Sequence, residues 1–125
     1  MIRCYVTDRR HGDLLSHVNI AIRSGIEIIQ VREKDLDARE LYELVCRVRD
    51  AASGTATKIL VNDRLDIALA ANLDGVHLPA NGLPAAQYPI GRLPGFLLQF
   101  QRQHRGHDTP TRRVHEHRDP SRAPG

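Results

Sequence analysis

The sequence predicts a parallel α/β fold, because short apolar segments alternate with amphipathic segments as far as about residue 98. The apolar segments are rich in β-branched residues, which favour buried strands, and the amphipathic segments have apolar residues at helical spacing. Hydrophobic residues make up 41% of the 125 residues and charged residues 26%, which are the values of a globular chain. This alternation is compatible with an open doubly wound sheet and with part of a barrel.

The first half of the chain contains two strand–helix units. Residues 2–7 are predicted as the first strand, and residues 13–24 follow it as an amphipathic helix. Residues 26–32 are the second predicted strand. The helix after them is the most clearly marked, because Asp37 and Glu40 have the spacing of a capping box at its start.

Two further units follow, and then the beginning of another strand. Residues 58–62 and 74–78 are predicted strands, with a short helix over residues 64–72 between them. A weak helix is expected over residues 83–91, and residues 95–98 begin a fifth strand. A complete eight-unit barrel typically takes ~250 residues, so this chain is expected to supply about four units and a fragment.

Residues 99–125 differ from the rest, since they contain only three hydrophobic residues among Arg, His, Gln, Pro and Asp. Six Arg and three acidic residues in this segment account for the chain's whole formal charge of +3. Such a segment buries too little apolar surface to offset the entropy cost of ordering, so we expect a disordered tail. It lacks the folded framework and aromatic residues of a nucleic-acid module, and nucleic-acid binding is not expected.

Several classes of protein do not fit the sequence. No apolar run approaches the ~18 residues of a membrane-spanning helix, and the first residues do not have the pattern of a secretory signal. Cys4 and Cys46 match no metal-binding spacing. We therefore expect a cytoplasmic protein with reduced thiols and no membrane partner.

Polar residues follow the predicted strands where each one ends. Gln30, Arg32 and Lys34 are spaced at two, so an extended chain would direct all three to one face. A guanidinium beside an ammonium group suits phosphate or diphosphate oxygens. The alternative is a solvated charged turn. Because Gln30 and Arg32 continue directly from an apolar strand, we favour the anion site.

Asn62 and Asp63 follow the third predicted strand. A carboxylate beside an amide could hold Mg²⁺ that bridges to diphosphate oxygens. The same residues are also favoured as helix N-caps, and the two roles are compatible for neighbouring residues. His77, in the fourth strand, is expected to be a hydrogen-bonded structural residue. Ligands of parallel α/β folds bind beyond the carboxyl ends of the strands, where these groups are predicted to lie.

Taken in order, these segments resemble the thiamine phosphate synthase family and its close relative, the thiazole tautomerase. The matching segments are residues 5–8, 30–34, 61–64 with Asp66 and Ala68, and 74–78, with the patterns Q-x-R-E-K, N-D-R and D-G-V-H-L. The resemblance implies a (βα)8 TIM barrel. It also implies a synthase that joins hydroxymethylpyrimidine diphosphate to thiazole phosphate in thiamine biosynthesis and releases diphosphate.

The resemblance implies that Gln30, Arg32, Lys34 and Asn62 contact the pyrimidine diphosphate and that Asp63 binds Mg²⁺. One departure is Gly82, which stands where the synthase has a second Mg²⁺ carboxylate. We expect weakened Mg²⁺ binding there, which moves the interpretation towards a tautomerase-like protein.

The larger departure is that the family's later strands and glycine-rich phosphate site are not seen after residue 98. We therefore expect residues 1–98 to be a truncated barrel, inactive alone, and residues 99–125 to be an out-of-frame tail. An exposed sheet edge and an uncovered inner face would favour self-association. The alternative from another class is a small α/β domain that binds anions or RNA with a basic arm.

Overall fold

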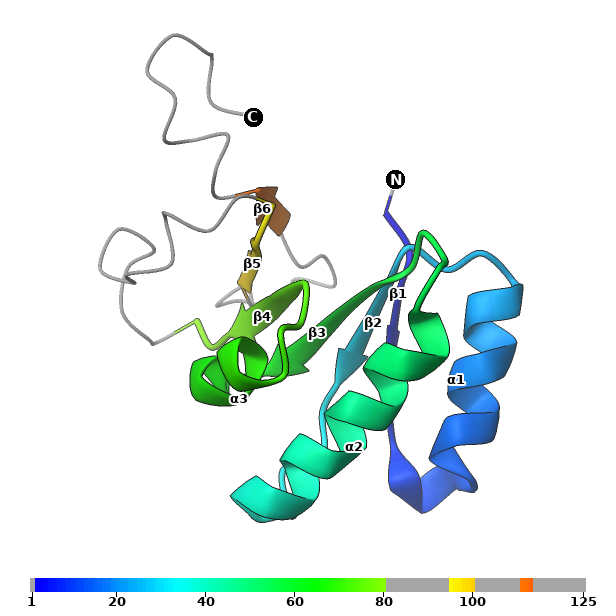
Figure 1. Ribbon diagram of the computed structural model, residues 1–125, viewed down its shortest axis with the longest axis horizontal. Coiled ribbons are helices and arrows are strands. Elements are labelled where there is room, and N and C mark those ends of the chain that lie inside the picture. The colour runs from blue at the N-terminus through cyan, green and yellow to red at the C-terminus, as the bar shows by residue number, and fades with distance from the viewer. Residues whose placement is uncertain (1, 81–94, 101–110, 114–125) are drawn as a thin grey trace, which may run out of the picture.

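The computed structural model describes residues 2–80, 95–100 and 111–113. Its sheet has the order β1-β2-β3-β4-β5-β6, in which β1 to β5 are parallel and β6 is antiparallel to β5 (Figure 1). Each strand pairs with the strand that precedes it in the chain, without the reversal of order of a doubly wound sheet. Successive units of a βα-barrel have this order, so the structure decides between the two predicted arrangements.

The first unit consists of β1 (Cys4–Val6), the 3-10 helix η1 (Arg9–His11) and α1 (Leu14–Arg23). The predicted first helix is confirmed. It ends before Gly25, whose φ of +82° lies in the left-handed region that favours glycine.

The second unit consists of β2 (Ile28–Val31) and α2 (Ala38–Ala52). The predicted capping box is present: the backbone nitrogen of Glu40 donates to the Asp37 carboxylate at 2.8 Å, and the Asp37 nitrogen donates to Glu40 Oε1 at 3.2 Å. Strand β2 ends one residue earlier than predicted. The backbone nitrogen of Arg32 donates to the Thr7 side chain at 3.0 Å instead of continuing the ladder.

The third unit consists of β3 (Lys58–Asn62) and α3 (Leu65–Ala70), and β4 (Gly75–Leu78) follows. Helix α3 is shorter than the predicted range of 64–72. It ends early because Asn72 has a left-handed φ of +55°, which does not continue a right-handed helix.

Strand β5 (Leu97–Phe100) is parallel to β4, and β6 (Thr111–Arg113) pairs with β5. Within the segment expected to be a disordered tail, Gln99, Phe100 and Thr111–Arg113 pair with neighbouring strands. The remaining tail residues, the helix expected over residues 83–91 and Gly82 lie outside the described residues.

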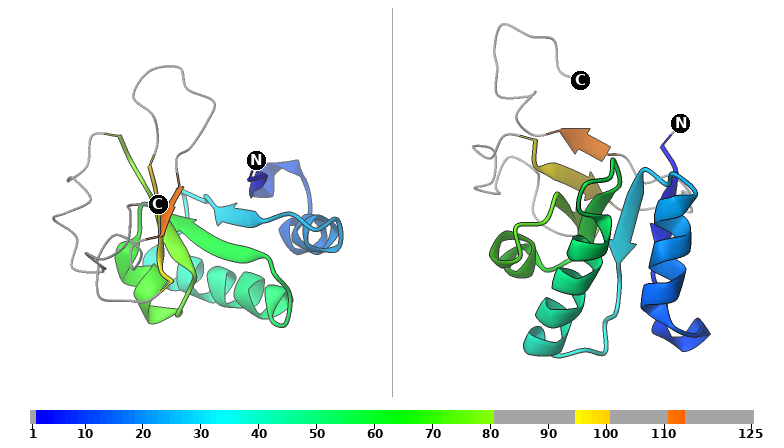
Figure 2. Two further views of the ribbon diagram at one scale, coloured as in Figure 1. Left: turned by 90° about the horizontal axis from the view of Figure 1, so that it is seen from above. Right: turned by 45° about the vertical axis from the view of Figure 1, so that its right-hand side comes forward.

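Helices α1, α2 and α3 cover one face of the sheet (Figures 1 and 2). The buried strand residues on this face, against which the half-buried Tyr5 of β1 packs, are all aliphatic and belong to the main core: Ile29, Val31, Ile59, Val61, Val76, Leu78 and Leu98. They pack against apolar residues of the helices, among them Val18, Val45, Val48 and Ala68. None of the helices within residues 2–80 combines the length and apolar character needed to cross a membrane.

The opposite face, called the inner face below, is strongly curved. Strands β2 and β5 are separated by β3 and β4, so a flat sheet would hold them roughly 14 Å apart. Yet Ile28 on β2 forms one buried cluster with Leu60 on β3 and Leu97 on β5. The sequence had suggested an uncovered inner face. At these three positions the face is buried instead, because barrel-like curvature brings the side chains together.

Candidate functional site

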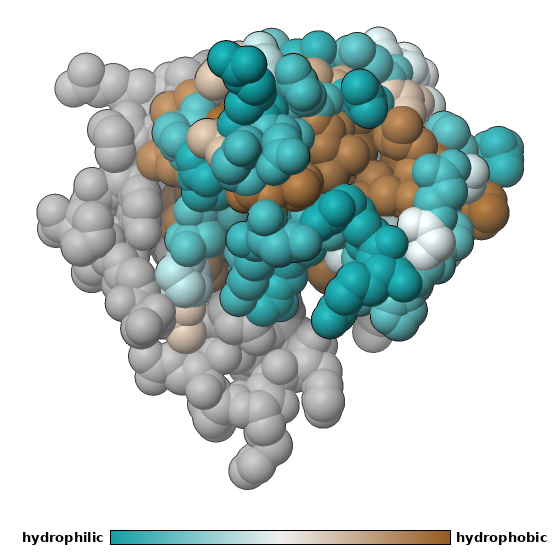
Figure 3. Space-filling model, turned by 90° about the horizontal axis from the view of Figure 1, so that it is seen from below, coloured by the Kyte–Doolittle hydropathy of each residue, from teal (hydrophilic) through white to brown (hydrophobic). Residues whose placement is uncertain are grey.

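The carboxyl ends of β1, β2 and β3 meet at one edge of the sheet, which is the lower edge in Figure 1. Figure 3 views the molecule from this side and shows hydrophilic side chains around an apolar area. Two neighbouring pockets open at this edge, and the segment that follows β2 lies between them, since Glu33 and Lys34 line both. This edge is therefore the candidate site.

The larger pocket, of about 590 Å³, lies between the segments that follow β1 and β2. Its lining is mainly polar and comprises Val6, Thr7, Asp8, Arg9, Arg10, Arg32, Glu33, Lys34 and Asp35. Four of these residues are cations, so the pairing of each cation decides whether the pocket can bind an anion.

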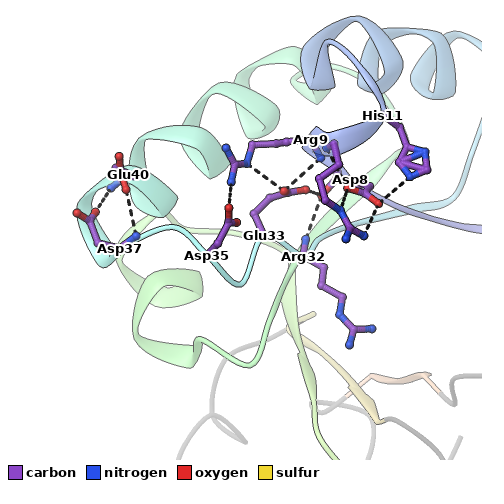
Figure 4. A network of polar contacts seen from close by, with 10 residues as sticks. Asp8, Arg9, His11, Arg32, Glu33, Asp35, Asp37 and Glu40 are labelled. Atoms are coloured by element: carbon purple, nitrogen blue, oxygen red, sulfur yellow. Dashed lines mark hydrogen bonds and ion pairs between the residues drawn. The ribbon is translucent and has the colours of Figure 1, made fainter.

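A buried carboxylate connects the two segments that form this pocket (Figure 4). Glu33 is only 7% exposed and accepts a hydrogen bond from the Thr7 hydroxyl at 2.8 Å. Its other oxygen accepts from the Arg9 backbone nitrogen at 3.2 Å and from Arg9 Nε at 3.1 Å. The Arg9 side chain also donates a hydrogen bond to Asp35. This bond is the main reason why the pKa of the Asp35 carboxyl is lowered. The charge of Arg9 is thus shared between two carboxylates.

Arg10 is paired as well. It donates to both oxygens of Asp8, at 3.0 and 2.9 Å, and these hydrogen bonds lower the pKa of Asp8 to about 2. His11 Nε2 lies 3.2 Å from the same carboxylate. This exposed group holds η1 in place and leaves Arg10 with little free charge for a ligand.

Arg32 and Lys34 are the two remaining cations of the pocket, and both side chains are exposed. In the part of the chain that the structure describes, neither has a carboxylate partner. The Arg32 guanidinium extends away from the Glu33, Arg9 and Asp35 group (Figure 4). Two cations without carboxylate partners, two residues apart in the segment that follows β2, suit the oxygens of a phosphate or diphosphate group.

The smaller pocket, of about 280 Å³, adds the end of β3 to the site. Lys34 lines it together with the half-buried Asn62 and the exposed Asp63. Asp63 has a left-handed φ of +58°, and its backbone nitrogen donates to the His77 carbonyl at 2.7 Å. The strained backbone places Asp63 at the pocket rim. It is not a helix cap, because the N-cap of α3 is Arg64, which makes no side-chain capping bond.

Gln30 lies apart from these exposed groups. Its side chain is 3% exposed on the inner face, and its Nε2 donates to Gln99 Oε1 at 3.4 Å. The same oxygen lies 3.0 Å from His77 Nδ1, so His77 is hydrogen-bonded within the sheet, as the sequence had suggested. Gln30 lines neither of the two pockets, although its Oε1 is buried without a hydrogen-bond partner among the described residues.

The structure therefore brings Arg32, Lys34, Asn62 and Asp63 to one edge and places Gln30 behind it, on the buried inner face. Sequence reasoning missed the roles of Thr7, Arg9 and Glu33. Glu33 alternates with two exposed cations, a spacing that would direct it to the opposite side of an extended chain. This alternation could have indicated from the sequence that Glu33 is buried.

The donor set for a metal ion is small. Within residues 2–80, 95–100 and 111–113, no group of three or more His, Cys, Asp or Glu side chains could hold a metal. Asp63 and Asn62 do offer hard oxygen ligands, and Mg²⁺ is often bound by one or two carboxylates together with substrate phosphates. The residues therefore fit an ion that is shared with a bound phosphate group.

Comparisons with known proteins point to one family. A family model described as thiamine monophosphate synthase matches residues 4–90. A relative from Geobacter sulfurreducens is 48% identical over 65% of this chain and 39% of its own length. A thiamine-phosphate synthase from Methanoculleus marisnigri is 40% identical over 72% of this chain and 41% of its own. The chain thus spans about two fifths of the length of these relatives.

A solved structure agrees with the sequence matches. Thiamine phosphate pyrophosphorylase from Pyrococcus furiosus superposes with a TM-score of 0.60 and is 36% identical in sequence. The superposition covers 66% of this chain and 42% of that protein. Both kinds of comparison therefore concern the same strand–helix units that carry the candidate site.

Proposed function

This chain belongs to the thiamine monophosphate synthase family, and from that premise we propose that it carries the diphosphate-binding part of a synthase-type site. The substrate would be a pyrimidine diphosphate, and the complete reaction would join it to a thiazole phosphate with release of diphosphate. Since the chain spans about two fifths of its relatives' length, we expect it to bind this substrate without turnover when alone.

One observation carries the proposal: the cations of the larger pocket fall into two classes. Arg9 and Arg10 are neutralised by Glu33, Asp35 and Asp8. Arg32 and Lys34 have no such partner among the described residues. An anion that enters the pocket would therefore gain most from Arg32 and Lys34, because their charge is not already compensated.

The remaining residues have supporting roles in this proposal. Asn62 would donate its amide hydrogens to the same phosphate oxygens, and Gln30 would contact the pyrimidine from the inner face. Asp63 would be the one protein carboxylate on Mg²⁺, which, when bound, would neutralise part of the diphosphate charge. We expect this Mg²⁺ to bind weakly, because Gly82 supplies no second carboxylate.

The chemistry explains why cations are needed at this edge. When the bond between the pyrimidine methylene and the diphosphate breaks, negative charge accumulates on the leaving diphosphate. Arg32 and Lys34 would stabilise that developing charge more than the charge of the intact substrate, which lowers the barrier. A displacement by a ring nitrogen needs no general base from these residues.

The test is calorimetric titration of the full chain with inorganic diphosphate, with and without Mg²⁺. Arg32→Ala is expected to lower the affinity about tenfold or more, since it removes a bidentate cation. Arg39→Ala is the matched control, because Arg39 is an exposed arginine on α2 away from the pocket. Asp63→Asn is expected to remove only the increase in affinity that Mg²⁺ produces.

Equal losses for Arg32→Ala and Arg39→Ala would contradict the proposal. Removal of residues 101–125, which keeps β5 and the Gln99 contacts, is expected to leave diphosphate binding by Arg32 and Lys34 intact. Salt-sensitive RNA binding that disappears with this truncation would instead support a binding domain with a basic arm.

A further inference from the structure

The hydroxyl of Thr7 is fully engaged by the segment that follows β2. Thr7 is 3% exposed and comes directly after β1. Its hydroxyl donates to Glu33 Oε2 at 2.8 Å and accepts from the Arg32 backbone nitrogen at 3.0 Å. Its own backbone nitrogen donates to the Gln30 carbonyl at 3.0 Å. One buried threonine thus holds three residues of the neighbouring segment.

A second contact, between Glu33 and Arg9, also attaches the segment that follows β2 to the residues that follow β1. Arg9 donates its backbone nitrogen and Nε to Glu33, so the buried carboxylate is both hydrogen-bonded and neutralised. A buried charge that is paired in this way stays in place, because moving it would leave it uncompensated. The backbone between Arg32 and Lys34 is consequently fixed to the end of β1 rather than left as a free loop.

This attachment determines where Arg32 and Lys34 lie, the two pocket cations without a carboxylate partner among the described residues. Because Glu33 is directed into the protein, the guanidinium of Arg32 extends to the other side of the backbone (Figure 4). Without the Thr7 hydroxyl, the Arg32 amide would lose its acceptor and the backbone at Arg32 would be free to move. The cation would then be ordered only when a ligand bound, which lowers affinity.

We propose that Thr7 and Glu33 are positioning residues that hold the Arg32 guanidinium in place for anion binding. The inference rests on the proposed function, in which Arg32 binds diphosphate. Both residues line the larger pocket, but neither contacts the anion in this proposal. Their side chains are buried, and their oxygens already take part in hydrogen bonds within the protein.

The test uses the full chain, inorganic diphosphate as the probe, and two variants of one residue. Thr7→Val keeps the branched shape and removes the hydroxyl, whereas Thr7→Ser keeps the hydroxyl. Thr7→Val is expected to lower diphosphate affinity about tenfold, and Thr7→Ser is expected to stay within about threefold of the unchanged chain. In an Arg32→Ala background, Thr7→Val is expected to have no further effect, since it acts through Arg32.

Equal affinity of Thr7→Val and the unchanged chain would overturn the inference. So would a loss that persists undiminished in the Arg32→Ala background, because Thr7 would then act by another route.

A second measurement separates this inference from the proposed function. Thr7→Val is expected to speed hydrogen exchange of the Arg32 amide about tenfold relative to Thr7→Ser. If the chain binds no diphosphate, the proposed function fails, and this exchange result alone judges the positioning role. An unchanged Arg32 amide in Thr7→Val would overturn that role whether or not diphosphate binds.

Discussion

On the helix-covered face of the sheet every buried strand residue is aliphatic, whereas the inner face of the same strands changes character along its length. Its buried residues towards the amino ends of the strands are apolar, with Ile28, Leu60 and Leu97 in one cluster. Towards the carboxyl ends it is polar, with Gln30, Asn62, His77 and Gln99. The uniform face stabilises the fold, and the graded face brings polar groups to the edge where the pockets lie.

This difference has a physical basis. Positions that face the helices must be close-packed and free of unpaired polar atoms. On the inner face, polar side chains can satisfy one another, as Gln99 does with Gln30 and His77. Chemistry is therefore possible on the inner face at a lower cost in stability.

Ile29 and Ile28 are neighbours on β2 that point to opposite faces, and they provide a matched pair. Ile29→Ala is expected to lower the free energy of unfolding by about 3–5 kcal/mol, because it leaves a cavity in the main core. Ile28→Ala is expected to cost about 2 kcal/mol, since its cluster has only three members. Urea denaturation would measure both. An equal or larger cost at Ile28 would contradict the contrast between the faces.

Gly75 tests the close approach of β4 and β5 on the inner face. A Cβ at this position would lie 2.3 Å from the Leu97 carbonyl oxygen and 2.7 Å from Leu97 Cβ. Gly75→Ala is expected to cost about 1–3 kcal/mol and to speed amide exchange in β5, because the two strands must separate. Gly54→Ala is the comparison variant: a Cβ there meets nothing within 4 Å, but the left-handed φ of +81° disfavours alanine. It is expected to cost about 1 kcal/mol without speeding amide exchange in β5. Unchanged protection of β5 in Gly75→Ala would refute the close contact.

The smallest effect is expected at Asp8, whose pKa is lowered to about 2 mainly by hydrogen bonds from Arg10. Because this value lies below the ordinary value of 3.8, ionised Asp8 stabilises the folded chain above pH 3.8. That contribution disappears as the pH falls through about 2. In Asp8→Asn the free energy of unfolding is therefore expected to fall less steeply between pH 3.8 and about 2 than in the unchanged chain. Denaturation midpoints across this pH range would measure the difference. A slope identical to that of the unchanged chain would show that the pair does not contribute.

Much of the fold could be predicted from local patterns. The capping box at Asp37 and Glu40 marks α2 because both partners lie within one helical turn. Strand Lys58–Asn62 was predicted at its observed bounds, since an unbroken aliphatic run indicates a strand buried in a parallel sheet. Strand β6 was missed, because Thr111–Arg113 has no apolar pattern, and its pairing with β5 cannot be read from the local sequence.

The candidate site was predictable only in part. Arg32, Lys34, Asn62 and Asp63 could be placed at one edge from the sequence, because parallel strands end on the same side of a sheet. The alternative of helix capping for Asp63 is wrong, since its left-handed backbone directs the chain past the cap position to Arg64. That conformation depends on the bond from Asp63 to the His77 carbonyl, which no local pattern indicates.

The sequence by itself determined the order of the strand–helix units, the helix-covered core and the residue types at the strand ends, because these follow from periodicities of a few residues. Only the tertiary structure decided which cations are free. The Thr7–Glu33 contact joins residues 26 apart, and the Gln30–Gln99 contact joins residues 69 apart. Such pairs form only when parallel pairing and barrel-like curvature bring the strands together. The buried Glu33 neutralises Arg9, whereas Arg32 has no carboxylate partner among the described residues.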